Sequence, residues 1–351
     1  ASGCTAQPDT PAPGTDRIAG IDLSAAGDGT DFNFGERWPG LIGGTVYLDR
    51  NGNGAFDAGS DGRLAGVTLT LHAGTGCATP ALASTTSAAD GSYLFGGSTT
   101  VGLTYTVCQA QPAGYADGGV NPGASAGSGA ANAITITNLP YPGSPDNHFG
   151  ERAGTVSGTV FVDLDHDGAF NAGETPIAGV TFTLSGSDVT GAAVLRTAVS
   201  DAAGQWRFDD LRAAGAGGYT VTEQTAQPVV GGTTTLNGRT TAGAGSAGGS
   251  ATPMTTTPSA VGGIALAAGA ASGGHLFGEL LPSSIAGSVF IDRDGDGQPQ
   301  AGDTGLAGVT LVLTGTDDLG QAVSRTVVTG ADGRYVFDGL RPGSYTVTQP
   351  D

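Results

Sequence analysis

The amino-acid sequence predicts an all-β protein, built as a tandem array of antiparallel β-sandwich domains. Two observations predict the strands: apolar and polar residues alternate along short segments, and turns rich in Gly, Pro or Asp-Gly separate those segments. A third observation predicts the array, because one long pattern returns three times along the chain. Alternation of this kind buries one face of a sheet, and we therefore expect almost no helix. It runs through Val67, Leu69 and Leu71, through Val180, Phe182 and Leu184, and through Val309, Leu311 and Leu313.

The repeated pattern opens with a strand, an acidic turn and a second strand. GTVYLDRNGNGAFDAGSDGRLAGVTLTL at 44–71 returns as GTVFVDLDHDGAFNAGETPIAGVTFTL at 158–184 and as GSVFIDRDGDGQPQAGDTGLAGVTLVL at 287–313. A strand with paired aromatics follows, in DGSYLF at 90–95, AGQWRF at 203–208 and DGRYVF at 332–337. A strand beginning with YTV then starts at 105, 219 and 345, and a closing segment ends in FGE at 34–36, 149–151 and 277–279. The distance between successive endings is that of a whole domain.

These landmarks divide the chain into four parts. Residues 37–152 form the first repeat, 153–280 the second, and 281–351 a third that lacks its closing segment. Residues 1–36 are predicted to be the closing strands of a preceding or neighbouring repeat, because GIDLSAAGDGTDFNFGE at 20–36 matches GIALAAGAASGGHLFGE at 263–279. Either the sequence is a window on a longer array, or subunits join head to tail by strand addition in trans. We favour the window, which needs no additional interaction.

The paired aromatic residues are expected to lie in the three cores. One pair per repeat at strand spacing favours core packing over a carbohydrate-binding platform. The expected core residues are Tyr93, Phe95, Trp206, Phe208, Tyr335 and Phe337, joined by Phe34, Phe149 and Phe277 from the closing segments.

Composition excludes several function classes. The chain of 351 residues carries a net charge of −19 with 64 Gly and 18 Pro, and all of its 13 basic residues are Arg. Such an excess of acid would be repelled by nucleic acid and by an anionic membrane surface. No apolar run approaches the length of a spanning helix, and the first residues, ASGCTAQPDT, show no signal-peptide features. We therefore expect no nucleic-acid binding and no membrane insertion.

Four carboxylates crowd into the turn after the first strand of the second repeat. With Asp163 as position 1, acids or amides occupy positions 1, 3, 5, 9 and 12, and Gly168 occupies position 6. This is the spacing of an EF-hand calcium loop, in which the glycine permits the sharp turn. The predicted Ca²⁺ ligands are Asp163, Asp165, Asp167, Asn171 and Glu174, with the backbone carbonyl of Ala169 at position 7.

The other two repeats carry variants of this loop. The third offers Asp292, Asp294, Asp296, Gln300 and Asp303, with the carbonyl of Gln298. The first offers Asp49, Asn51, Asn53 and Asp57, the carbonyl of Ala55, and Ser60 at position 12 with Asp61 after it. Fewer carboxylates attract a cation less strongly, so we expect calcium affinity to fall from the second loop to the third and then to the first. Magnesium is disfavoured because it requires a tight octahedron and retains its waters.

The alternative for these turns is an acidic hairpin that stays solvated and holds no metal. Three matches at the same place in three repeats argue against it. Strands rather than helices flank each loop, so we expect calcium to hold a β-domain together instead of opening a sensor groove.

The combined pattern of acidic turn, DGxYxF, YTVTE and closing FGE resembles the B-type repeats of serine-aspartate repeat surface adhesins, the SdrD B-like domains. These are related to collagen-adhesin B domains and to prealbumin-like, Ig-like sandwiches. The resemblance covers nearly the whole chain and implies stalk modules of an extracellular bacterial surface protein, with calcium in the loops at 49–61, 163–174 and 292–303 stiffening a rod. Some relatives instead lock the sandwich with a Lys–Asn isopeptide bond, which the absence of Lys excludes here.

The three cysteines allow one disulfide at most. Cys77 follows the second strand of the first repeat and Cys108 lies in its YTV strand, so a bridge between them or two free thiols are both open. Cys4 has no obvious partner within the chain.

Two further features have open interpretations. We expect residues 231–263, rich in Gly and Thr, to form a mobile surface loop that could accept O-linked sugars. Glu36, Glu151 and Glu279 recur at the domain ends, where a salt bridge, a metal ligand or a solvated strand end would each fit. We favour the solvated strand end.

No Ser/His/Asp or Cys/His set recurs or converges, so we do not expect an enzyme. The leading hypothesis is a structural, calcium-stiffened module of a surface protein or secreted filament whose partners are neighbouring repeats or copies, with a host or matrix ligand as a further partner. A ligand-binding adhesin domain and an accessory module of a secreted enzyme are the alternatives.

Overall fold

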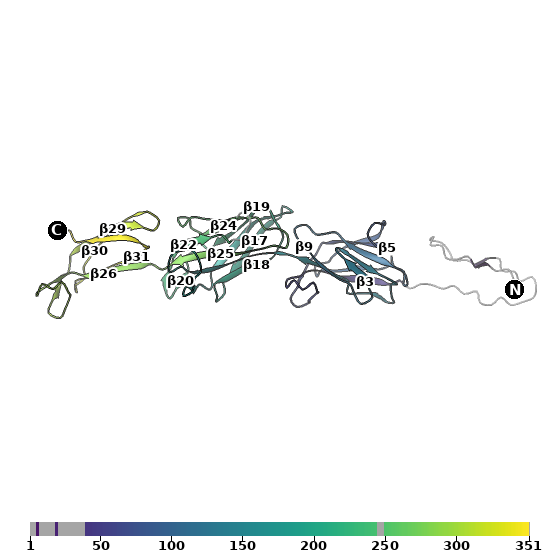
Figure 1. Cartoon of the computed structure of the whole chain (residues 1–351), viewed down its shortest axis with the longest axis horizontal. Coiled ribbons are helices and arrows are strands. Elements are labelled where there is room, and N and C mark those ends of the chain that lie inside the picture. The colour runs from purple at the N-terminus through teal and green to yellow at the C-terminus, as the bar shows by residue number, and fades with distance from the viewer. Residues whose placement is uncertain (1–4, 7–17, 20–38, 244–248, 351) are drawn as a thin grey trace, which may run out of the picture.

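The computed structural model describes residues 5–6, 18–19, 39–243 and 249–350, which form strands and turns without a helix. The predicted all-β class is confirmed, and this part of the chain has no helix suited to crossing a membrane. Three strand-rich bodies follow one another along the long axis (Figure 1). Most of the predicted closing segment at 1–36, with Cys4, Phe34 and Glu36, lies outside the described residues; the short pair β1 (Thr5–Ala6) and β2 (Ile18–Ala19) falls within them.

The first sandwich encloses one core between two sheets. One sheet has the order β10 (Ser128–Ala130), β11 (Ala133–Ile136), β8 (Tyr105–Gln109), β5 (Thr68–Ala73) and β6 (Ala81–Thr86). The other has the order β12 (Gly143–Ser144), β3 (Leu41–Leu48), β13 (His148–Arg152) and β9 (Ala116–Asn121), with β4 (Gly62–Arg63) and β7 (Ser92–Phe95) also paired to β3.

The second sandwich repeats this plan. One sheet contains β15 (Thr175–Pro176), β14 (Gly154–Val162), β25 (Ala271–Leu280) and β22 (Leu236–Thr241), with β18 (Gln205–Leu211) on β14. The other contains β17 (Ala193–Val199), β16 (Thr181–Asp188), β19 (Ala214–Glu223), β24 (Ala260–Ile264) and β23 (Ser250–Ala251). A separate hairpin joins β20 (Val229–Val230) to β21 (Thr233–Thr234).

The third repeat has the opening strands of the plan. Here β26 (Ser283–Ser288) pairs with β31 (Arg334–Leu340), and β27 (Phe290–Ile291) pairs with β28 (Thr304–Gly305). The facing sheet is β30 (Ala322–Val328), β29 (Thr310–Asp317) and β32 (Gly343–Thr348). Within 283–350, β26 has no parallel closing partner such as β25 provides for β14, and Tyr335 is half-buried where Trp206 is buried.

The first and last strands of a complete repeat run parallel. β13 pairs parallel with β3, and β25 pairs parallel with β14, while almost all other pairings are antiparallel. Because entry and exit strands point the same way, the chain enters each sandwich at one end and leaves it at the other. The repeats therefore extend along one axis instead of folding back on each other (Figure 1).

The aromatic residues occupy the cores as predicted. Tyr93, Phe95 and Phe149 are buried in the first repeat, and Trp206, Phe208 and Phe277 in the second. Trp206 stacks on Phe182 with ring centroids 4.8 Å apart, and Phe277 meets it edge-on. In the third repeat Phe337 is buried, and Tyr335 packs against the core while remaining partly exposed.

The prediction of a mobile loop over 231–263 was wrong for its described residues. β22 pairs with β25 and β24 pairs with β19, so the segment contributes strands to both sheets. Thr235, Thr240 and Val261 are buried there. Threonine has a high strand propensity, and a Thr-rich stretch with buried alternate residues is compatible with a strand as well as a loop. Residues 244–248 lie outside the described part.

Candidate cation sites

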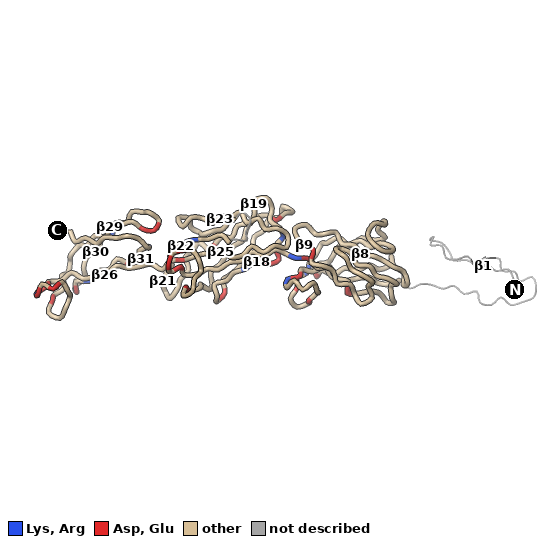
Figure 2. Tube along the Cα trace, viewed as in Figure 1, with Lys and Arg blue, Asp and Glu red and all other residues tan. Residues whose placement is uncertain are grey.

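Each acidic turn connects two strands that pair antiparallel with each other: β3 with β4, β14 with β15, and β27 with β28. Figure 2 draws the Asp and Glu residues of these turns in red. In each, the carboxylate at position 1 accepts a 2.9 Å hydrogen bond from the backbone N–H of the glycine at position 6. The pairs are Asp49 with Gly54, Asp163 with Gly168, and Asp292 with Gly297. All three glycines have a φ between +71° and +75°, a left-handed conformation that explains the residue type.

The loop of the second repeat gathers carboxylates around one point. Ligand atoms of Asp163, Asp165 and Glu174 lie within 4.8 Å of one another. The backbone N–H groups of Leu164 and Asn171 hold the two oxygens of Glu174, each at 2.8 Å. Asp163 is buried, and this burial raises its pKa. A carboxylate desolvated beside other carboxylates is stabilised by a nearby cation.

Asp167 occupies position 5 of the same loop and is solvent-exposed. The backbone N–H of Ala169 donates to its Oδ1 at 2.7 Å, and this hydrogen bond lowers the pKa of Asp167. Its Oδ2 accepts from the amide nitrogen of Asn171 at 2.9 Å. The loop thus keeps Asp167 ionised and orients it through short-range contacts.

The loop of the third repeat has the same geometry with greater exposure. Asp292, Asp294 and Asp296 place ligand atoms within 4.8 Å of one another, and all three are exposed. The N–H of Gly297 holds the pKa of Asp292 below its usual value. Asp303 accepts from the N–H groups of Arg293 at 3.3 Å and Gln300 at 3.1 Å, which is the arrangement seen at Glu174.

The loop of the first repeat is one residue longer. Asp61, and not Ser60, takes the place of Glu174, because it accepts from the N–H groups of Arg50 at 3.3 Å and Asp57 at 2.8 Å. Ser60 is exposed, and its backbone carbonyl accepts from Arg50 Nη1. The amide groups of Asn51 and Asn53 donate to Asp57 at 2.9 and 2.8 Å.

Two of the loops are anchored to the neighbouring strand. Thr241 of β22 donates to the carbonyl of Gly168 at 3.0 Å, and Asn121 of β9 donates to that of Gly54.

The aromatic residue at position 8 of these two loops adds a packing contact, with Phe170 on Phe161 and Phe56 on Tyr47. The third loop has Pro299 at that position and no described counterpart of β9 or β22, which explains its exposure.

The donor set fits a hard divalent cation. All of the predicted ligands are oxygen donors, which is the chemistry that calcium requires. In the second loop Asp163, Asp165, Asp167, Asn171, Glu174 and the carbonyl of Ala169 would hold the ion. The amide of Asn171 directs its nitrogen to the carboxylates of Asp165 and Asp167, and a half-turn of the amide would direct its oxygen there instead.

The interpretation of Glu151 and Glu279 as solvated strand ends was wrong. Both side chains are 0% exposed, because β13 and β25 are central strands whose side chains at this position point inward. Gln109 and Gln111 donate to the two oxygens of Glu151, and burial raises its pKa to about 7. Gln109 lies on β8, far from Glu151 in the sequence, so spacing alone did not signal the contact.

In the second repeat, Glu223 stands where the first has Gln109. Glu223 and Glu279 are both buried, and burial raises the pKa of each. Repulsion by the neighbouring Glu223 raises the pKa of Glu279 further. Thr235 donates to Oε2 of Glu279 at 3.0 Å, and among the described residues the Oε1 atoms of both glutamates lack a hydrogen-bond partner.

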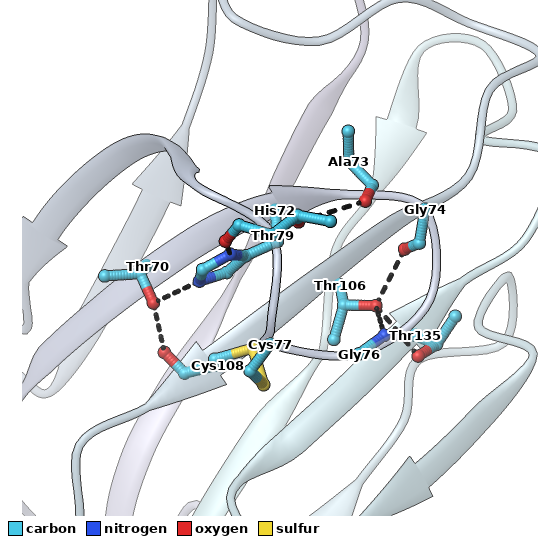
Figure 3. The surroundings of a disulfide bond; sticks show 10 residues. All are labelled: Thr70, His72, Ala73, Gly74, Gly76, Cys77, Thr79, Thr106, Cys108 and Thr135. Atoms are coloured by element: carbon cyan, nitrogen blue, oxygen red, sulfur yellow. Dashed lines mark hydrogen bonds between the residues drawn. A yellow bond between two sulfur atoms is a disulfide. The ribbon is translucent and has the colours of Figure 1, made fainter.

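A disulfide joins Cys77 and Cys108 in the first repeat (Figure 3). It ties the loop after β5 to β8, and Thr106 Oγ1 adds hydrogen bonds of 2.9 Å to Gly74 and Gly76 of that loop.

His72 lies beside the disulfide and contacts Thr70 and the carbonyl of Thr79. Cys4, whose partner the sequence left open, lies outside the described residues.

The model of the SdrD B-like domain family matches the chain three times, at residues 40–141, 154–263 and 283–350. Two similar proteins come from Staphylococcus aureus. The bone sialoprotein-binding protein of strain MRSA252 is 30% identical over 262 residues, covering 74% of this chain and 21% of that protein. Serine-aspartate repeat-containing protein E of strain Newman is 31% identical over 264 residues, covering 74% and 20%. The chain spans about a fifth of the length of these curated relatives.

Solved structures resemble the chain only weakly. The Bacillus anthracis TIE protein aligns with a TM-score of 0.29 and 14% identity, over 89% of this chain and 46% of that one. The shaft pilin SpaA of Lactobacillus rhamnosus GG aligns with a TM-score of 0.27 and 13% identity, over 69% and 98%.

Proposed function

This chain belongs to the family of SdrD B-like domains, and on that premise we propose that it is a structural module of a bacterial surface protein or filament, stiffened by calcium. The supporting observation is the cluster of Asp163, Asp165 and Glu174, whose ligand atoms approach within 4.8 Å in a loop organised by backbone N–H groups. The role proposed is mechanical and not catalytic.

Calcium would act on the link between strands. Asp163 follows β14 directly, Glu174 precedes β15 directly, and the carbonyl of Gly168 is bonded to β22. A cation shared by these carboxylates would join the two ends of the loop and offset the repulsion between them. The parallel entry and exit strands would then transmit tension from one repeat to the next along the long axis.

The relatives support an extracellular location. Two of them are named as a serine-aspartate repeat-containing protein and a bone sialoprotein-binding protein of Staphylococcus aureus. We place this chain outside the cell, on the surface or in a secreted filament, where the Cys77–Cys108 disulfide would persist. Its proposed partners are neighbouring repeats or copies, and a host or matrix ligand for the protein that carries it.

The test is thermal unfolding with calcium, with magnesium and with EDTA. A ligand that binds only the native state raises its stability by mass action, so calcium should raise the unfolding midpoint by several degrees above the EDTA value. Magnesium should raise it less. Equal midpoints in calcium and EDTA would contradict calcium stiffening and leave only the structural role.

A second candidate is assembly head to tail by strand addition in trans. It is favoured by the free edge of β26, which within 283–350 lacks the parallel partner that β25 gives to β14. Residues 20–36 of another copy share the pattern of 263–279 and are candidates for that place. Analytical ultracentrifugation over a concentration series tests this, since a protein that stays monomeric throughout does not assemble in this way.

A further inference from the structure

The repeats are joined without a flexible linker. β13 ends at Arg152 and β14 begins at Gly154, and Ala153 between them packs against the first core. β25 ends at Leu280 and β26 begins at Ser283. A short connection limits the distance between two domains but leaves their relative rotation free, so the angle depends on contacts between the facing surfaces.

At the first junction, Asp210 takes a conformation that normally selects glycine. Its φ is 56°, and the equivalent residues of the other repeats are Gly97 with φ 78° and Gly339 with φ 61°. Its carboxylate crosses the junction and binds the guanidinium of Arg50, with Nε to Oδ1 at 3.0 Å and a second contact from Nη2 to Oδ2. Arg50 belongs to the acidic loop of the first repeat.

The second junction lacks this pair on both sides. Leu164 stands at the position of Arg50 and is 61% exposed, and Gly339 stands at the position of Asp210. The charged residues therefore occur together at the first junction and are absent together from the second. If Asp210 served only the second repeat, its presence would not be expected to depend on an Arg in the first repeat.

The second junction has its own substituted glycine. His166 has a φ of 65°, where the loops of the other repeats have Gly52 with φ 72° and Gly295 with φ 79°. Its Nε2 lies 3.0 Å from Oδ2 of Asp318, in the turn between β29 and β30 of the third repeat. Both junctions thus contain one non-glycine residue in a left-handed position, and in each case its side chain contacts the neighbouring repeat.

An arginine of the following repeat completes each junction. Arg341 binds Asp318 with Nε to Oδ1 at 2.6 Å and donates to the backbone carbonyl of Asn237 in the second repeat at 2.8 Å.

At the first junction, the equivalent Arg212 lies over the ring of Tyr115 in the first repeat, 5.0 Å from its centroid. Beside it, the N–H of Ala213 donates to the carbonyl of Gly114 at 2.8 Å.

We propose that Asp210 and His166 are recognition residues that make the two junctions specific, non-interchangeable interfaces and fix the angle between successive repeats. The partner of each surface is the neighbouring repeat of this chain. The Arg50–Asp210 pair is partly exposed and adds little to folding stability, and a non-glycine residue in a left-handed conformation costs a comparable amount. Asp318 already has an ion pair with Arg341 of its own repeat, so its further contact with His166 acts across the junction. The gain from Asp210 and His166 therefore lies in orientation. The proposal goes beyond calcium stiffening, because neither contact involves a metal ion.

The experiment measures each junction separately in the full chain. Spin labels are placed at exposed strand residues, one per repeat, on Thr86, Thr197 and Ser324, with Cys4 replaced by serine. The variants are Asp210→Gly and His166→Gly, each of which introduces the residue that the other repeats carry. We expect Asp210→Gly to broaden the Thr86–Thr197 distance distribution about twofold and to leave Thr197–Ser324 unchanged, and His166→Gly to do the reverse.

Each variant serves as the control for the other. An unchanged distribution across a variant's own junction overturns the proposal for that residue, and broadening at both junctions by one variant shows a general loosening that overturns it as well. If either glycine variant lowers the unfolding midpoint, Arg50→Leu and Asp318→Asn test the same contacts from the opposite side. Repeating the measurement in EDTA separates this result from calcium stiffening, because the broadening should occur with and without the metal.

Discussion

Glu223 and Glu279 place their carboxyl groups side by side in the interior of the second repeat, where they are 3% and 0% exposed. Ionising both of two adjacent buried carboxyls has a large free-energy cost, so this pair retains at least one proton at a pH where solvated glutamates have lost theirs. The first repeat avoids the conflict, because Gln109 and Gln111 donate to Glu151.

This pair should make the second repeat less stable as pH rises. Its carboxyl pKa values are raised in the folded state, so the stabilising effect is complete below the unfolded pKa near 4.5 and is lost as pH rises through the folded values. Glu223→Gln should flatten this dependence and increase the free energy of unfolding at pH 8 by about 1–3 kcal/mol. Urea unfolding followed by Trp206 fluorescence, in a Trp38→Phe background, measures it.

The matched control is Gln109→Glu, which creates a second pair beside Glu151 in the first repeat. It should introduce the same loss of stability with rising pH there, detectable by hydrogen exchange in β8 and β13. A second repeat whose stability stays constant between pH 5 and pH 9 would show that the two carboxyls are not coupled.

The cation response of the second repeat should depend on Glu174. Both of its oxygens accept hydrogen bonds from backbone N–H groups, so Glu174→Gln removes the charge and keeps one of these two hydrogen bonds, through the amide oxygen. A tenfold loss of calcium affinity would reduce the calcium-dependent gain in stability by about 1.4 kcal/mol. Trp206 fluorescence with calcium and with EDTA measures that gain. Asp201→Asn, in an exposed turn outside the loop, should leave it intact; equal gains in both variants would exclude Glu174 as a ligand.

The local parts of the candidate sites could be predicted from the sequence. Positions 1, 3, 5 and 12 of each loop lie within a dozen residues, so their spacing predicts their proximity, and the structure brings Asp163, Asp165 and Glu174 together. The same reasoning reached the core aromatics through strand alternation. It could not decide between Ser60 and Asp61, because a one-residue insertion shifts the register of a loop.

The parts that depend on distant strands could not be predicted. The burial of Glu279 requires β22 and β25 to pair, and Glu223 to approach from the opposite sheet. The strands within 231–263 are equally dependent on partners elsewhere in the chain. Asp210 and His166 carry a signal that the sequence does contain, since each replaces a glycine of the other repeats, but its meaning requires the backbone conformation and the residue across the junction.

The Cys77–Cys108 disulfide should stabilise the first repeat alone. It closes a sequence separation of 31 residues, for which chain entropy predicts about 3–4 kcal/mol. Replacing both cysteines with serine should lower the free energy of unfolding of that repeat by about this amount, measured as faster hydrogen exchange in β5 and β8. Trp206 fluorescence, which reports on the second repeat, should be unaffected, and a reducing agent should have no further effect on the double variant. A change in the second repeat would contradict independent unfolding.

A buried hydroxyl recurs at one place in all three repeats, and its removal should be costly. Ser200 donates to the carbonyl of Ile177 at 2.8 Å and accepts from the N–H of Val180 at 2.9 Å, and Ser87 and Thr329 make the same two bonds. Ser200→Ala leaves both backbone groups without their partner, so the free energy of unfolding of the second repeat should fall by about 1–3 kcal/mol. Ser200→Thr keeps the hydroxyl, as the third repeat does, and should lose much less. Equal losses in urea unfolding of the two variants would mean that packing, and not the two hydrogen bonds, determines the residue at this position.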